Sequence, residues 1–159
     1  KDQIAKDHNQ AVMTSKDDEG SHNFEIILII FTTGKGNCLE HGWTQYLLVN
    51  ITKRKDAGSY KHRKKQVIYI QARLHAAETH GSLIMSKIIK ELSSNFEKYD
   101  TILNRNIIKL VPMINPDGVV LGNSRSSLAG VDLNRRWCNP NATIHPELYF
   151  LKMNMKATA

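Results

Sequence analysis

Two nearly continuous apolar segments with an amphipathic segment between them constrain the fold of this chain most strongly. Residues 66–72 (QVIYIQA) and 107–114 (IIKLVPMI) are each typical of a buried strand. From Thr79 to about residue 96, apolar side chains recur every three or four positions, which predicts an amphipathic helix. Strand, helix and strand in this order predict a βαβ unit in a largely parallel, buried sheet.

Strand-like segments also precede this unit. Residues 24–33 and 46–52 are mostly apolar and predict two further strands, and a last helix is expected from His145 onward. Residues 1–23 are polar and mixed in charge, which predicts a flexible lead-in. We therefore expect one domain over residues 24–159. Its predicted fold class is α/β, part of a three-layer sandwich with helices on the faces of a mixed, mostly parallel sheet.

Composition limits the class of protein. The chain has 159 residues, of which 41% are hydrophobic and 23% charged, as in globular proteins. The longest apolar run is too short to cross a membrane, and the N-terminus lacks the pattern of a secretory signal. Cys38 and Cys138 are predicted to be free thiols, which favours the cytoplasm. No membrane partner is expected.

The chain is basic, with a net charge of +7, and this charge favours an acidic partner or substrate. The densest basic run, residues 61–65, is predicted to be a solvated loop. Nucleic-acid binding is not expected, because no interleaved aromatic residues or recognition helix accompany that run. Gly34-Lys35-Gly36 is predicted to be a turn, since it lacks the third glycine and the following helix of a dinucleotide-binding loop.

Chemically versatile residues follow both strands of the predicted βαβ unit. His75 and Glu78 come directly after residues 66–72. At a spacing of three residues their side chains can bind one zinc ion. Such a pair alone is weak evidence for a metal site. An Asn-Pro-Asp-Gly turn at residues 115–118 should open on the same edge of the sheet. Arg125, Asn134 and Arg135 follow in a long loop. They suit a substrate with a free carboxylate, and one arginine could instead stabilise an oxyanion.

Three motifs in this order resemble a known family. They are His75-x-x-Glu78-Thr79, Val111-Pro112-Met113-x-Asn115-Pro116-Asp117-Gly118, and Arg125-x-Ser127-Leu128-Ala129-Gly130-Val131-Asp132-Leu133-Asn134-Arg135. Together they resemble the zinc metallocarboxypeptidases of the carboxypeptidase A superfamily, and most closely the cytosolic carboxypeptidases, known for trimming glutamates from tubulin. The resemblance is strong from about residue 67 to residue 149.

The resemblance implies a role for five residues. His75 and Glu78 match the first two zinc ligands, and Arg125 matches the arginine that polarises the scissile carbonyl. Asn134 and Arg135 match the pair that binds the C-terminal carboxylate of the substrate. The turn at residues 115–118 matches a structural feature of the family, so Asp117 is expected to cap the turn and to have no catalytic role.

The sequence also departs from the family pattern. Ala76-Ala77 stands where this branch usually carries Pro-Gly, so the ligand turn could sit slightly differently. The family's third zinc ligand, a histidine, and its general-base glutamate have no match in these 159 residues. His62, His80 and His145 are not expected to replace that ligand. A two-ligand site should hold zinc poorly and turn over little substrate.

Two main functions remain open. The resemblance implies a zinc-dependent carboxypeptidase that removes C-terminal residues, plausibly glutamates, from protein tails such as those of tubulin. The alternative is a catalytically incomplete fragment or a non-catalytic module that binds peptide C-termini. An incomplete sheet would also expose the edge of its last strand, which predicts poor solubility or self-association.

Overall fold

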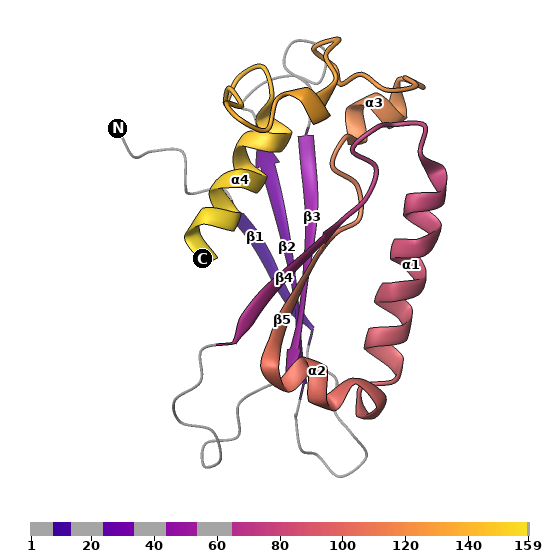
Figure 1. Ribbon diagram of the computed structural model, residues 1–159, viewed down its shortest axis with the longest axis vertical. Helices are drawn as coiled ribbons and strands as arrows, with labels where there is room; N and C mark the ends of the chain where they lie inside the picture. The colour runs from indigo at the N-terminus through magenta and orange to yellow at the C-terminus, as the bar shows by residue number, and fades with distance from the viewer. Residues whose placement is uncertain (1–7, 14–23, 34–43, 54–64, 159) are drawn as a thin grey trace.

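A computed structural model describes residues 8–13, 24–33, 44–53 and 65–158 of the chain. Its strands form one five-stranded mixed sheet with the order β1-β2-β3-β5-β4 (Figure 1). The strands are β1 (His8–Met13), β2 (Phe24–Thr33), β3 (Thr44–Lys53), β4 (Gln66–Gln71) and β5 (Asn106–Val111). The longer helices are α1 (Thr79–Ser94) and α4 (Pro146–Thr158), and the shorter ones are η1 (Glu97–Tyr99), α2 (Asp100–Arg105), α3 (Pro116–Val120) and η2 (Leu133–Arg135).

The predicted βαβ unit is confirmed. Strands β4 and β5 are parallel neighbours, joined by α1, the short η1 and α2. The other three pairings of the described strands, β1 with β2, β2 with β3 and β3 with β5, are antiparallel. The sheet is therefore mixed, as predicted, but the expectation of mostly parallel pairing is wrong for these strands. A parallel pair needs a long crossover connection, whereas antiparallel neighbours can follow one another through a shorter one.

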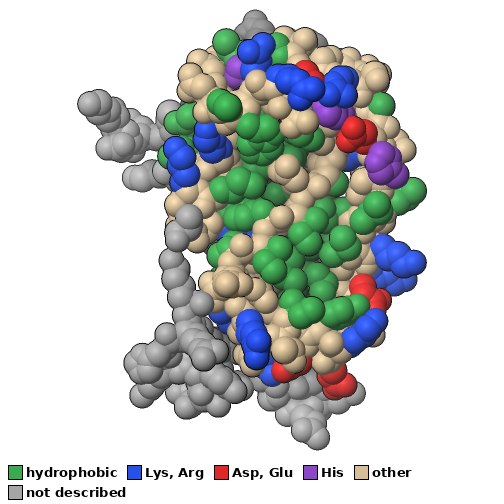
Figure 2. Space-filling view, viewed as in Figure 1, with side chains coloured by type: hydrophobic (Ala, Val, Ile, Leu, Met, Phe, Trp, Pro, Cys, Tyr) green, Lys and Arg blue, Asp and Glu red, His purple; other side chains and the backbone are tan. Residues whose placement is uncertain are grey.

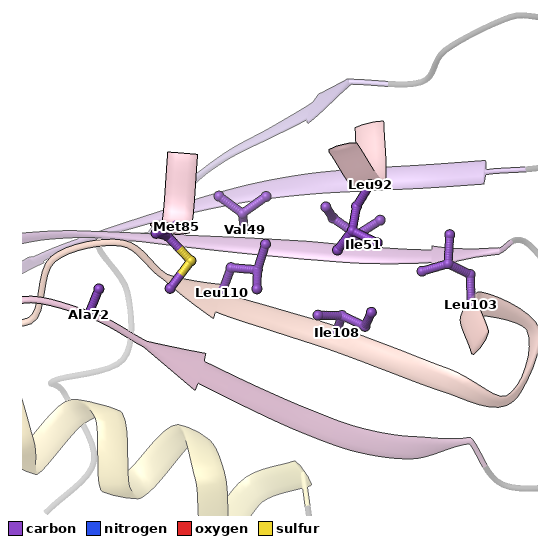
Figure 3. Close-up of a cluster of buried hydrophobic side chains, with 8 residues drawn as sticks. All are labelled: Val49, Ile51, Ala72, Met85, Leu92, Leu103, Ile108 and Leu110. Atoms are coloured by element: carbon purple, nitrogen blue, oxygen red, sulfur yellow. The ribbon is translucent and has the colours of Figure 1, made fainter. Parts of the chain in front are cut away.

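Helices cover both faces of the sheet, as a three-layer arrangement requires (Figure 1). Val49 and Ile51 of β3 point to the face covered by α1 and α2, together with Ile108 and Leu110 of β5. Met85 and Leu92 from α1 and Leu103 from α2 complete this cluster, which is entirely apolar (Figure 3). Side chains alternate between the two faces of a strand, so Leu48 and Val111 lie on the opposite face and pack with α4.

Several details differ from the sequence-based predictions. Strand β1 lies within residues 1–23, which were expected to be a flexible lead-in. Helix α2 was not predicted, and the turn at residues 115–118 is the start of helix α3. The cap of that helix is Asn115, whose side chain accepts a hydrogen bond from the Gly118 N–H, and not Asp117. The predicted turn at residues 34–36, Cys38 and residues 61–64, including His62, lie outside the described residues.

One edge of the sheet is open among the described residues, because β4 pairs there with β5 alone. Hydrophobic side chains gather on the surface over β4 and along α1 (Figure 2). They include Ile68 of β4, and Leu83 and Ile84 of α1. The open edge belongs to β4, whereas β5, the last described strand in the sequence, is paired on both sides, so the expectation of an exposed last strand is wrong for these residues. In the part of the chain that the structure describes, no helix is long and apolar enough to span a bilayer, and Cys138 is a free, exposed thiol.

Candidate functional site

The turn after β4 brings two potential metal ligands to the end of the sheet. Its backbone is tied to the segment after β5, because the Ile114 N–H donates to the Ala72 carbonyl at 3.0 Å and the Asn115 N–H donates to the Arg73 carbonyl at 3.0 Å. Arg73 has a φ of 54°, a left-handed conformation that few residues other than glycine adopt. This turn delivers His75, which is buried, and Glu78, which is exposed at the start of α1.

Both ring nitrogens of His75 face carboxylates. Nδ1 lies 2.9 Å from Oε1 of Glu78, and Nε2 lies 3.0 Å from Oδ1 of Asp132. A neutral imidazole carries one N–H, so it can donate to only one of these oxygens. If Nε2 donates to Asp132, the lone pair of Nδ1 faces the carboxylate of Glu78. A proton on Nδ1 or a metal cation satisfies that pair of atoms, and imidazole nitrogen with carboxylate oxygen is a donor set that zinc accepts.

Asp132 links His75 to the loop that carries the predicted substrate-binding residues. Its Oδ1 also accepts a hydrogen bond from the Asn134 N–H at 2.9 Å, and its Oδ2 accepts one from Nε of Arg125 at 2.8 Å. The adjacent guanidinium of Arg125, with smaller contributions from His75 and the Asn134 N–H, lowers the pKa of Asp132 to about 2. Asp132 is therefore a carboxylate at neutral pH, which suits an acceptor that fixes the orientation of a ligating imidazole.

Sequence reasoning assigned no role to Asp132, although it lies within one of the quoted motifs. A signal was present, because a metal-ligating histidine nearly always donates its second N–H to a carboxylate, a carbonyl or water. The sequence could not show which acceptor this is. His75 and Asp132 are 57 positions apart in the chain, and only the tertiary structure brings them together.

The structure joins three of the five predicted site residues into one series of side-chain contacts. It runs from Glu78 through His75 and Asp132 to Arg125. Asn134 and Arg135 lie in η2, directly after Asp132 and Leu133 in the sequence, and both are exposed. Leu133, which begins η2, is fully buried and anchors it against the hydrophobic cluster under α4. Charged and histidine side chains gather at this end of the molecule (Figure 2).

His75 and Glu78 fit two positions of a zinc site. Within the described segments, no group of three or more His, Cys, Asp or Glu side chains is arranged to hold a metal ion. His145 is buried, and its Nδ1 accepts a hydrogen bond from the Asn141 N–H at 3.1 Å, while burial and the nearby charge of Arg136 lower its pKa. His80 is exposed on α1. Among the described residues, the predicted zinc ligands are therefore limited to His75 and Glu78, whereas a catalytic zinc site needs three protein ligands.

Comparisons with known proteins agree on one family. The sequence profile described as "Zinc carboxypeptidase" matches residues 7–149. Cytosolic carboxypeptidase 1 of Mus musculus is 41% identical over 109 residues, which are 66% of this chain and 9% of that protein. Cytosolic carboxypeptidase 6 of Caenorhabditis elegans is 42% identical over 88 residues, which are 55% of this chain and 19% of that protein.

Solved structures give the same result. A metallo-carboxypeptidase from Burkholderia cenocepacia superposes with a TM-score of 0.65 at 25% identity, over 74% of this chain and 31% of that one. A metallo-carboxypeptidase from Pseudomonas aeruginosa, in complex with (2-guanidinoethylmercapto)succinic acid, superposes with a TM-score of 0.61 at 26% identity, over 74% and 30%. The chain therefore spans less than a third of these two structures and a smaller share of the two relatives named above.

Proposed function

Because the chain belongs to the zinc carboxypeptidase family, we propose that it supplies the metal-binding turn and the carboxylate-binding loop of an enzyme that removes C-terminal residues from protein tails. One observation carries this proposal. The chain of contacts from Glu78 through His75 and Asp132 to Arg125 joins two zinc-type ligands to a guanidinium at the end of the sheet. Such a chain places a cation-binding pair and an anion-binding group in one site.

Each residue has a distinct part in this proposal. His75 and Glu78 would hold a zinc ion, which when bound would supply Lewis-acid polarisation of the scissile carbonyl. Asp132 keeps the imidazole of His75 in the orientation in which Nδ1 faces Glu78. The Nε of Arg125 is engaged by Asp132, so its two terminal nitrogens remain to donate to the oxyanion. The side chains of Asn134 and Arg135 bind the C-terminal carboxylate of the substrate.

Acidic tails are the substrate that the charge of the chain favours. The net charge is +7, and exposed Arg135 is followed by a second exposed arginine, Arg136. We propose that C-terminal glutamates, such as those of tubulin tails, are removed in the cytoplasm. The similarity to proteins named cytosolic carboxypeptidases supports this location.

A second function is favoured by the incomplete ligand set. With two zinc ligands and no third metal-ligating side chain grouped with them among the described residues, the chain can retain binding of a C-terminal carboxylate while it lacks turnover. The two functions share the carboxylate-binding residues. Binding of a tail is therefore the property to test first, and release of glutamate from the same peptide then separates the enzyme from the binding module.

The test measures the affinity of a labelled acidic peptide that ends in a free glutamate. The change is Arg135→Gln, and the control is Arg105→Gln, which removes the same charge from α2 at the opposite end of β5. Loss of a charge-assisted hydrogen bond should weaken binding roughly tenfold to a hundredfold for Arg135→Gln alone. The unchanged protein should bind a C-terminally amidated peptide equally weakly. Equal affinity for the free and amidated peptides would contradict carboxylate recognition.

A further inference from the structure

We propose that Asn115 is a positioning residue that sets the location of Arg125 relative to His75. Asn115 lies just after β5 and is completely buried. Both ends of its side-chain amide are used. Oδ1 accepts a hydrogen bond from the Gly118 N–H at 3.0 Å, and Nδ2 donates to the Ser126 carbonyl at 3.0 Å. The side chain therefore spans from the start of α3 to the loop that carries Arg125.

Arg125 lies between two backbone carbonyls that are each held in place. On one side, the carbonyl of Ser124 accepts a hydrogen bond from the Ala77 N–H at 2.9 Å, within the turn that carries His75 and Glu78. On the other side, the carbonyl of Ser126 accepts from Asn115 and, at 3.2 Å, from Nδ2 of Asn123. The backbone of Arg125 is thus fixed to the metal-binding turn and to the end of β5 before its side chain reaches Asp132.

Gly118 shows how closely these segments approach one another. A Cβ atom at this position would lie 2.6 Å from each terminal atom of the Asn115 amide and 2.7 Å from the Ser126 carbonyl oxygen. Real Cβ atoms do not approach other atoms so closely. Glycine is therefore required here by the contact between α3 and the Arg125 loop, although its own backbone conformation is ordinary.

The chemistry of the position also selects asparagine. The Gly118 N–H requires an acceptor and the Ser126 carbonyl requires a donor, and an amide presents both from one short side chain. Aspartate would face the carbonyl of Ser126 with a second acceptor, and serine is too short to reach both groups. A buried amide with both ends satisfied holds the two segments at a fixed separation, because either group left unpaired would cost free energy.

This inference deepens the proposed function, because Arg125 can meet an oxyanion only if its loop is correctly placed. The structural part can be tested without activity. In the unchanged protein, the hydrogen bond from Nε–H of Arg125 to Asp132 should slow exchange of that proton with solvent. If Asn115 positions the loop, Asn115→Ser should speed exchange of the Arg125 Nε–H about tenfold, as expected for loss of a charge-assisted hydrogen bond. NMR on the full chain measures this exchange.

The matched control is Leu92→Ala, which destabilises the cluster under α1 on the other face of the sheet. It should leave the Nε–H protection of Arg125 unchanged. Asn123→Ala removes the longer of the two amide contacts to the Ser126 carbonyl. Asn123 is half-buried, so the fold should tolerate the change. The Nε–H protection of Arg125 should fall by a smaller factor than in Asn115→Ser. Asn123→Ala therefore tests whether contacts at the Ser126 carbonyl position Arg125 even if Asn115→Ser does not fold.

Two results would overturn the role of Asn115. One is unchanged Nε–H protection in both asparagine variants, and the other is an equal loss of protection in Leu92→Ala. The same samples are then tested for binding of the glutamate-terminated peptide. If the unchanged protein does not bind that peptide, the proposed function fails, while the exchange measurement still decides whether Asn115 positions Arg125.

Discussion

The two faces of the sheet are built from different kinds of side chain. On the α1 face, the buried cluster contains only apolar residues from β3, the segment just after β4, β5, α1 and α2 (Figure 3). On the α4 face, a similar cluster around Leu133 and Leu148 is accompanied by buried polar groups. These are Asn50 and Lys109 on the strands and Glu147 in the first turn of α4.

The candidate site is attached to the more polar of these faces. Leu133 is part of the α4-side cluster and directly precedes Asn134 and Arg135. The α1 face instead supplies apolar packing for the βαβ unit as a whole. The difference indicates that the α1 face mainly stabilises the fold, whereas the α4 face also anchors the segment that carries Asn134 and Arg135. Substitutions on the two faces should therefore have different consequences.

The largest effect is expected from equal truncations on the two faces. Leu110→Ala on the α1 face and Leu148→Ala on the α4 face each remove a fully buried side chain. Each should lower the free energy of unfolding by about 3–5 kcal/mol, measured in urea. Only Leu148→Ala should also speed amide exchange at Asn134, because Leu148 packs with Leu133. Faster exchange at Asn134 in both variants would show that the faces do not act separately.

An intermediate effect is expected at Glu147. Its side chain is 2% exposed, and its Oε2 has no hydrogen-bond partner among the described residues. Burial, together with the charge of Asp117, raises the pKa of Glu147 from 4.5 to about 7. The folded state therefore favours the neutral acid. Below pH 4.5 Glu147 is protonated in both the folded and the unfolded state, so its titration should not change the free energy of unfolding. That free energy should fall as the pH rises from 4.5 to 7 and stay lower above that range.

Glu147→Gln tests this sign directly, because glutamine is neutral at every pH. At pH 8 the variant should be more stable than the unchanged protein by about 2–3 kcal/mol, and at pH 4.5 the two should be nearly equal. Urea unfolding at both values measures the difference. Glu97→Gln, which alters an exposed acid in η1, is the control for the loss of one carboxyl group. A less stable Glu147→Gln variant at pH 8 would refute this account of the α4 face.

The fold was predictable wherever a segment has a clear period. The two apolar segments and the helix between them predicted the βαβ unit, which the structure confirms. The direction of β3 was not predictable in this way, because its apolar run is compatible with either neighbour and either direction. Strand β1 was missed for a related reason, since His8–Met13 mixes polar and apolar residues and is a strand only through its pairing with β2.

The sequence predicted which residues belong to the candidate site, but not how their side chains contact one another. The three motifs identified the family, which the comparisons confirm. Asp132, which joins His75 to Arg125, and Asn115, which holds the Arg125 loop, depend on contacts between distant segments. Hydrogen bonds of this kind have no periodic signature in a sequence. The roles proposed for His75, Glu78, Arg125, Asn134 and Arg135 stay predictions until binding is measured.

The smallest effect is expected at Lys109, the buried cation of the α4 face. Its Nζ donates to Oδ1 of Asn154 at 3.1 Å and lies 5.4 Å from the ring centre of Tyr69, and both of these partners are neutral. Burial lowers the pKa of Lys109, which means that the folded state disfavours its charge. Lys109→Met should therefore change the free energy of unfolding at pH 7 by less than about 1 kcal/mol, with a small gain favoured.

The pH dependence makes this last prediction specific. Because the pKa of Lys109 is lowered in the folded state, the unchanged protein should gain stability relative to the variant as the pH rises toward 10.5. Asn154 keeps a donor in the variant, since the Tyr69 hydroxyl donates to the same Oδ1 at 2.5 Å. Urea unfolding of both proteins between pH 7 and pH 10 gives the comparison. A loss of more than about 2 kcal/mol at pH 7 would mean that Lys109 holds α4 to the sheet, and that the polar groups of this face stabilise it.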